Sequence, residues 1–153
     1  MPRIFISYRR DDSAFAAHSI YEKLKDLFGE ESITFDVNFS LGMDFAKKID
    51  ESVCRCDVLL AIIGDRWLDL RFADGPMQGQ RRLDDPNDWV RLEIDSALKK
   101  DILVIPVLVG KVSIADLAPG LPPDLAELTK KVAISVRVSV HGVIAHVLPT
   151  GIS

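Results

Sequence analysis

A tryptophan and a glutamate one helical turn apart are the side chains in this sequence best suited to chemistry. Trp89 and Glu93 lie in "DDPNDWVRLEI" (residues 84–94), where an acidic stretch gives way to a helix-like pattern. Residues four apart share one side of a helix, and the helical wheel places Glu93 at the border of an apolar stripe. Carboxylates at such borders can acquire raised pKa values and catalytic roles. Spacing alone favours the commoner case, a solvated helix glutamate.

Two neighbouring arginines, Arg9 and Arg10, follow Tyr8 at the end of an apolar segment. Guanidinium groups match phosphate oxygens in charge and geometry, so the pair suits a phosphate-bearing ligand. The alternative is that both arginines form surface ion pairs with Asp11 and Asp12. The residue types do not separate these two interpretations.

The histidines and cysteines give no sign of a metal site. His18, His141 and His146 lack the spacing of metal ligands, and Cys54 and Cys56 lack a nearby histidine partner. We expect two reduced thiols. The glycines form neither a dinucleotide fingerprint nor a phosphate-binding loop. The sequence therefore predicts no metal and no resident cofactor.

Composition and charge narrow the class of protein. The chain has 153 residues, which suits one domain, and a net charge of −4, which argues against a broad nucleic-acid-binding face. No uncharged apolar run is long enough to span a membrane. Charged residues arrive too early for the apolar core of a signal peptide. We therefore expect a cytoplasmic protein that binds neither membranes nor nucleic acids.

Short apolar runs alternate with helical patterns along the chain. Strands are expected at residues 3–8, 32–37, 57–64, 101–110 and 132–138. Helices are expected from a cap at Asp12 or Ser13 to Gly29, at 45–53, at 89–99, briefly after "LPPDL" and in the tail. Continuous apolar strands indicate a parallel sheet covered on both faces. We predict one flavodoxin-like α/β domain with five strands in the order 2-1-3-4-5.

Ligands of such sheets bind at the carboxyl ends of the strands. The loops at 9–13, 37–43 and 65–88 should therefore surround the site. The last of these is unusually long for a compact domain, and loops of this length tend to be functional. Arg81 and Arg82 inside it are most simply interpreted as solvated charges.

Taken in order, several segments resemble the Toll/interleukin-1 receptor (TIR) domain family, especially its bacterial members. They are "FISYRRDDS" (5–13), "FDVNFSLGMDF" (35–45), "CDVLLAIIGDRWL" (56–68), "RRLDDPNDWVRLEIDSAL" (81–98), "IPVLVG" (105–110) and "LPPDLAEL" (121–128). The resemblance covers about residues 3–136 of a single domain spanning 1–153. The tail after residue 136 departs from the family pattern, and we expect a final helix there.

The resemblance implies an enzyme that cleaves NAD+. In NAD-cleaving TIR domains the glutamate of a W-x-x-x-E helix is catalytic, and it corresponds here to Glu93. Nicotinamide is already cationic in NAD+, so one carboxylate near the developing oxocarbenium ion suffices. The products would be nicotinamide and ADP-ribose or a cyclic isomer. The substrate-binding residues expected with it are Tyr8, Arg9, Arg10, Asp36, Phe39, Leu41, Gly42, Trp67 and Trp89.

The resemblance also implies partners and a setting. TIR domains associate through the loop that corresponds to residues 37–45, and head-to-tail contacts of this kind can extend into filaments. Bacterial anti-phage signalling is the setting expected for an NAD-cleaving member. The alternatives are a non-enzymatic TIR–TIR adaptor and a factor that interferes with host signalling.

Two unrelated functions fit parts of the pattern. A phosphoacceptor receiver domain would use paired acids after the first strand, and Asp11 and Asp12 stand there. It would also need a lysine near Arg137, and Arg9 and Arg10 crowd the acids. A nucleoside glycosyl-transferring enzyme would likewise place a carboxylate at an anomeric carbon, and activity on free deoxynucleosides would reveal it.

Overall fold

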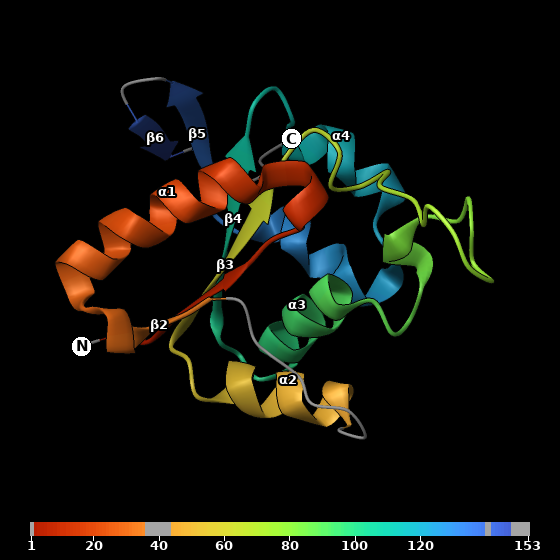
Figure 1. Cartoon of the computed structure of the whole chain (residues 1–153), viewed down its shortest axis with the longest axis horizontal. Coiled ribbons are helices and arrows are strands. Elements are labelled where there is room, and N and C mark those ends of the chain that lie inside the picture. The colour runs from red at the N-terminus through yellow and green to blue at the C-terminus, as the bar shows by residue number, and fades with distance from the viewer. Residues whose placement is uncertain (1, 36–43, 140–141, 148–153) are drawn as a thin grey trace.

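A computed structural model describes residues 2–35, 44–139 and 142–147, with side chains described for 2–35 and 44–137. Its centre is a six-stranded sheet in the order β2-β1-β3-β4-β5-β6 (Figure 1). The strands are β1 Ile4–Ser7, β2 Ile33–Thr34, β3 Val58–Ile63, β4 Leu103–Val109, β5 Ile134–Ser139 and β6 Gly142–Val147. Strands β1 to β5 pair in parallel, which confirms the predicted five-stranded order.

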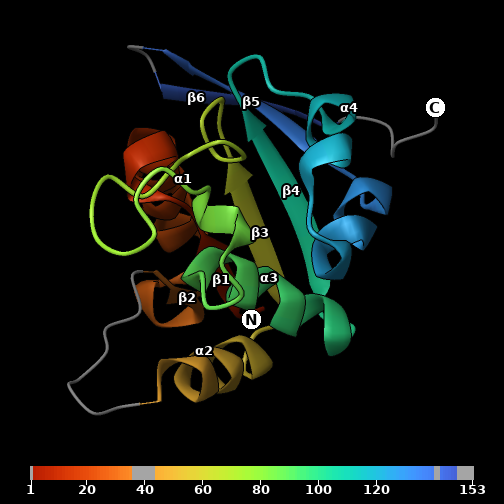
Figure 2. The ribbon, with the colours of Figure 1, turned by 90° about the vertical axis from the view of Figure 1, so that its right-hand side faces the viewer.

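Helices cover both faces of this sheet (Figure 2). They are α1 Arg10–Phe28, α2 Phe45–Cys54, α3 Trp89–Lys99 and α4 Ile114–Leu117, with 3-10 segments η1 Glu30–Ser32, η2 Arg82–Asp84, η3 Ala118–Gly120 and η4 Pro123–Lys130. The predicted helix at 89–99 is confirmed at both ends. Within the part of the chain that the structure describes, no helix is both long and apolar enough to cross a membrane.

Alternate strand residues divide between two apolar cores, as the period of a strand requires. Phe5 and Leu59 belong to the core that also takes in residues of α2, α3 and η4. Ile4 and Ile62 belong to the other core, which contains residues of α1. The alternation decides which residues at the end of β1 point toward α3.

The tail forms a strand where we expected a helix. β6 pairs antiparallel with β5, with Val136 opposite Ala145 and Ile134 opposite Val147. The segment is rich in β-branched residues, which fit a pleated surface better than a helix. Pairing also covers an edge of β5 that would otherwise remain open. The prediction of a final helix was wrong for residues 142–147.

Helix α1 begins earlier than predicted. Its N-cap is Arg9, and Ser13 interrupts the helical backbone at φ −140° and ψ 31°. Asp12, one of the two residues that we expected to cap the helix, instead accepts hydrogen bonds of 2.8 Å from the backbone N–H groups of Gly64 and Arg66. A Cβ at Gly64 would come within 2.6 Å of that carboxylate. Asp12 therefore ties the start of α1 to the end of β3.

The long segment between β3 and α3 is folded against the core. Trp67, Leu70 and Leu83 are buried within it, and Arg71 and Arg81 form an isolated antiparallel bridge. These buried side chains fix the segment, so it can serve as one wall of a binding site.

Candidate active site

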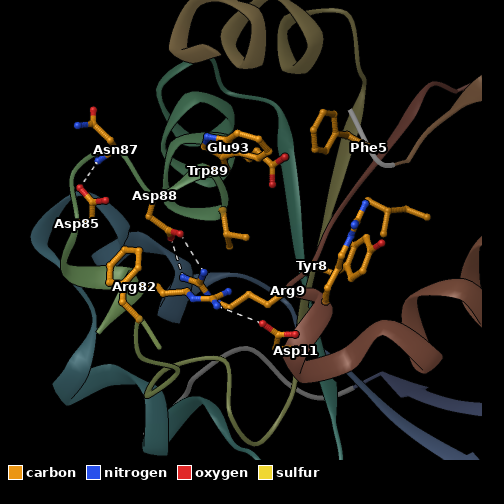
Figure 3. A pocket seen from close by; sticks show the side chains of 14 residues that line it. Phe5, Tyr8, Arg9, Asp11, Arg82, Asp85, Asn87, Asp88, Trp89 and Glu93 are labelled. Carbon is orange, nitrogen blue, oxygen red and sulfur yellow. Dashed lines mark hydrogen bonds and ion pairs between the residues drawn. The ribbon is translucent and has the colours of Figure 1, made fainter. Parts of the chain in front are cut away.

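A pocket of about 680 Å³ lies beside the carboxyl end of β1 (Figure 3). Its volume falls in the range of small-molecule and cofactor sites. Residues from β1, the start of α1, the long segment and α3 line it: Phe5, Ile6, Tyr8, Arg9, Arg10, Asp11, Phe72, Arg82, Asp85, Asn87, Asp88, Trp89, Val90 and Glu93. The site therefore lies at the end of the sheet that the sequence predicted.

Glu93 is held at the wall of this pocket by a hydrogen bond from β1. Ser7 Oγ donates to Glu93 Oε1 over 2.8 Å, and Ser7 is 1% exposed. Ser7 shares a strand face with Phe5, so its hydroxyl points toward α3. Glu93 itself is partly buried, as its border position on the helical wheel predicted. Ser7 was not among the predicted site residues, because nothing in the sequence pairs it with a residue 86 positions away.

The start of α3 is fixed by a side-chain cap. Asp88 accepts a hydrogen bond of 3.1 Å from the backbone N–H of Arg91, which satisfies one of the unpaired amides of the first turn. Trp89 follows at once, is 48% exposed and lines the pocket. Its ring lies 6.0 Å from that of Phe45, tilted by 42°. The cap thus sets the direction from which Trp89 and Glu93 face the pocket.

Arg9 lies deeper than we expected. It is 4% exposed, and its Nη1 and Nη2 donate to the two carboxylate oxygens of Asp88 over 2.9 and 2.7 Å. Its Nε donates to the carbonyl oxygen of Trp67, and its guanidinium lies 5.7 Å from the centre of that indole. A guanidinium bound in this way joins the end of β1 to the cap of α3. Arg9 is therefore in neither of the two arrangements that we expected. It does not form a surface ion pair with Asp11 or Asp12, and its guanidinium is bound within the protein and not turned to a ligand.

Trp67 does not line the pocket. It is 1% exposed and belongs to the core beneath Arg9. Its side chain is large and apolar, and burial in the core removes it from water. The structure therefore corrects the expectation that Trp67 contacts a substrate directly.

Tyr8 and Arg10 both line the pocket, as predicted. Tyr8 is half-buried, and its ring stacks on Phe35 with centroids 5.1 Å apart and an interplanar angle of 14°. Arg10 is exposed and starts α1. The remaining predicted binding residues, Asp36, Phe39, Leu41 and Gly42, lie outside the described residues.

A third arginine that lines the pocket was not among the predicted site residues. Arg82, interpreted above as a solvated charge, lines the pocket and forms an ion pair of 3.2 Å with Asp11. The sequence feature that could have identified Arg82 is its position in the long loop after the central strand. Loops at the carboxyl ends of strands bind ligands in such folds.

The described residues contain no group of three or more His, Cys, Asp and Glu side chains arranged to hold a metal ion. Both cysteines are free. Burial raises the pKa of the Cys56 thiol, which lowers the fraction of reactive thiolate. Neither cysteine lines the pocket.

The fold and the pocket together define a doubly wound α/β domain with a carboxylate at the ligand-binding end of its sheet. The family model described as "TIR domain" matches residues 4–137, so the chain belongs to the TIR domain family. No curated protein matches the sequence.

Two solved structures illustrate the likeness. A metazoan TIR-STING receptor from C. gigas, in complex with 2',3'-cGAMP, matches with a TM-score of 0.56 and 17% identity over 92% of this chain. The TIR domains of the activated Roq1 resistosome, which directly recognizes the pathogen effector XopQ, match with a TM-score of 0.51 and 13% identity over 85%. This chain spans 36% of the receptor and 70% of the Roq1 chain. At these identities the likeness establishes the fold alone.

Proposed function

We propose that this TIR domain is an NAD+ nucleosidase that cleaves the bond between nicotinamide and ribose. The observation that carries the proposal is Glu93, a carboxylate held by Ser7 at the wall of a pocket of about 680 Å³. The exposed indole of Trp89 lies one helical turn before it on the same wall. A single fixed carboxylate beside an aromatic plate suits a reaction that develops positive charge on a sugar.

The chemistry needs little from the protein beyond placement and charge. The bond between C1' and the pyridinium nitrogen breaks, and its electron pair neutralises the departing nicotinamide. The ribose becomes oxocarbenium-like, and the Glu93 carboxylate stabilises that charge. Water then attacks C1' and releases a proton, which gives ADP-ribose. Attack by a nitrogen of the adenine base would give a cyclic isomer instead, when the site excludes water.

In this proposal the other residues of the pocket wall each contact a different part of the substrate. Trp89 stacks on an aromatic base, and Tyr8 lines the same cavity. Arg10 takes the contact with the diphosphate that we first assigned to both arginines, because Arg9 is committed to Asp88. Asp36 and the loop at residues 38–43, which the resemblance implies would close the site, lie outside the described part of the chain.

Self-association completes the proposal. The loop at residues 37–45 contacts a second copy, so that turnover per chain rises with protein concentration. The biological setting is cytoplasmic immune signalling against phage.

Product analysis tests the proposed function. The purified chain is incubated with NAD+, and nicotinamide, ADP-ribose and cyclic products are separated by chromatography. Wild type should release nicotinamide, and Glu93→Gln should not. A wild-type chain that self-associates without consuming NAD+ over a wide concentration range would refute the enzyme and favour the adaptor alternative.

A further inference from the structure

Two oppositely charged side chains face each other at the wall of the pocket. Arg82 Nη2, from η2, lies 3.2 Å from Asp11 Oδ2 in the first turn of α1 (Figure 3). Both residues line the pocket. The pair joins segments 71 residues apart, so its charges meet only in the folded chain.

This pair is built differently from the buried pair beside it. The side chains of Arg9 and Asp88 are 3% and 9% exposed and share two short hydrogen bonds. The side chains of Arg82 and Asp11 are 31% and 60% exposed and share one contact. Exposed pairs contribute little to stability, since water and ions screen them. The Arg82–Asp11 contact can therefore exchange for another anion at low cost.

The charge of the pocket favours that exchange when an anionic ligand enters. Three arginines and four carboxylates line the wall, so the formal balance is negative. Arg9 is already neutralised by Asp88. Beyond Arg10, which the proposed function already assigns to the diphosphate, a second guanidinium for this ligand must be both accessible and held by a weak partner. Arg82 meets both conditions.

We propose that Arg82 joins Arg10 in binding the diphosphate of the dinucleotide and that Asp11 competes with the diphosphate for the guanidinium of Arg82. Phosphate oxygens accept charge-assisted, bidentate hydrogen bonds from arginine, and a diphosphate carries more charge than one carboxylate. Asp11 thereby sets how much negative charge a ligand needs to enter. This inference rests on the proposed function for the identity of the ligand, and it adds a residue pair that selects for phosphorylated over unphosphorylated nucleosides.

Opposite effects of two charge-neutralising variants test the proposal. Calorimetry measures the Kd of ADP-ribose and of adenosine, which has no phosphate, on Arg82→Gln, Asp11→Asn and the double variant. Arg82→Gln should raise the Kd of ADP-ribose by about tenfold or more, the loss expected for a charged hydrogen bond. Asp11→Asn should lower it by about two- to fivefold. The Kd of adenosine should change in neither variant.

The double variant and a matched control separate competition from a general change in charge. Asp11→Asn should lose most of its effect in the Arg82→Gln background, since the competed group is gone. Arg71→Gln removes a more exposed arginine of the same segment, whose Nη1 donates to the carbonyl of Gly79 outside the pocket. It should leave the Kd of ADP-ribose unchanged. Thermal melting of each variant checks that the fold is intact.

The Kd values and the NAD+ turnover test two different proposals, so each proposal can be refuted without the other. An unchanged Kd in Arg82→Gln, or a higher Kd in Asp11→Asn, would overturn the competition, as would a wild-type chain that does not bind ADP-ribose. A wild-type chain that shows the predicted pattern of Kd values but does not consume NAD+ would overturn the proposed nucleosidase and leave the diphosphate site standing.

Discussion

Ser7 Oγ donates a hydrogen bond of 2.8 Å to Glu93 Oε1, joining the end of β1 to the second turn of α3. The same two elements are joined again by Arg9, whose guanidinium holds the capping carboxylate of Asp88. One contact positions the carboxylate at the pocket wall, and the other positions the helix that carries it.

Glu93→Ala and Glu93→Gln should both abolish NAD+ cleavage. Loss of one charge-stabilising group costs roughly two to three orders of magnitude in kcat in comparable sites. The melting temperature should change little, because a carboxylate at the edge of the core contributes little to packing. Substantial turnover in either variant would remove Glu93 from the catalytic role, and a large loss of stability would mark it as structural.

Ser7→Ala should lower kcat more than it raises KM, because Ser7 positions the carboxylate and does not line the pocket. Ser7→Thr, which keeps a hydroxyl, should retain more activity than Ser7→Ala. Equal losses in the two variants, or a large fall in melting temperature, would indicate a packing defect.

Arg9→Ala should destabilise the fold by about 3–5 kcal/mol, because it leaves the buried Asp88 carboxylate without its partner. Arg10→Ala is the matched control: Arg10 is exposed, so stability should hold while KM for NAD+ rises. Urea denaturation of both variants measures the difference. Equal stability of the two would contradict the structural role of Arg9.

Asp50 should make stability depend on pH at the contact between α2 and α3. The hydrogen bond from Ser96 Oγ, at 2.7 Å, and the ion pair with Lys100 lower the pKa of Asp50 below its usual 3.8. A lowered folded-state pKa contributes stability above pH 3.8, and this stability is lost as pH falls through the folded value. Asp50→Asn should melt below wild type at pH 7, and the gap should close in acid. The exposed Asp74→Asn should show no such gap.

Phe39→Asp and Leu41→Asp should each reduce activity without affecting Glu93, although both residues lie outside the described part of the chain. A charge at an apolar contact between copies would have to be desolvated. Specific activity across a wide dilution series measures the dependence on assembly. Activity that stays constant on dilution, and is full in both variants, would show that one chain carries the whole site.

The local sequence pattern alone was enough to predict most of the strands and helices. Continuous apolar runs predicted strands that differ from β1, β3, β4 and β5 by one or two residues at each end. The apolar stripe of α3 predicted that helix residue for residue. The tail was harder, because an apolar β-branched segment fits a strand or a helix until a neighbouring strand offers an edge. β5 offers that edge to residues 142–147.

The sequence by itself determined that this chain is a doubly wound α/β domain of the TIR family and that Glu93 stands at the border of its helix. Periodicity acts over a few residues, so it can be recognised without the fold. Only the tertiary structure decided which polar side chains meet. It paired Ser7 with Glu93, buried Arg9 against Asp88 and brought Arg82 to Asp11 at the pocket wall. These contacts join residues 71 to 86 positions apart, and their partners are chosen by strand order and helix packing, which local sequence does not encode.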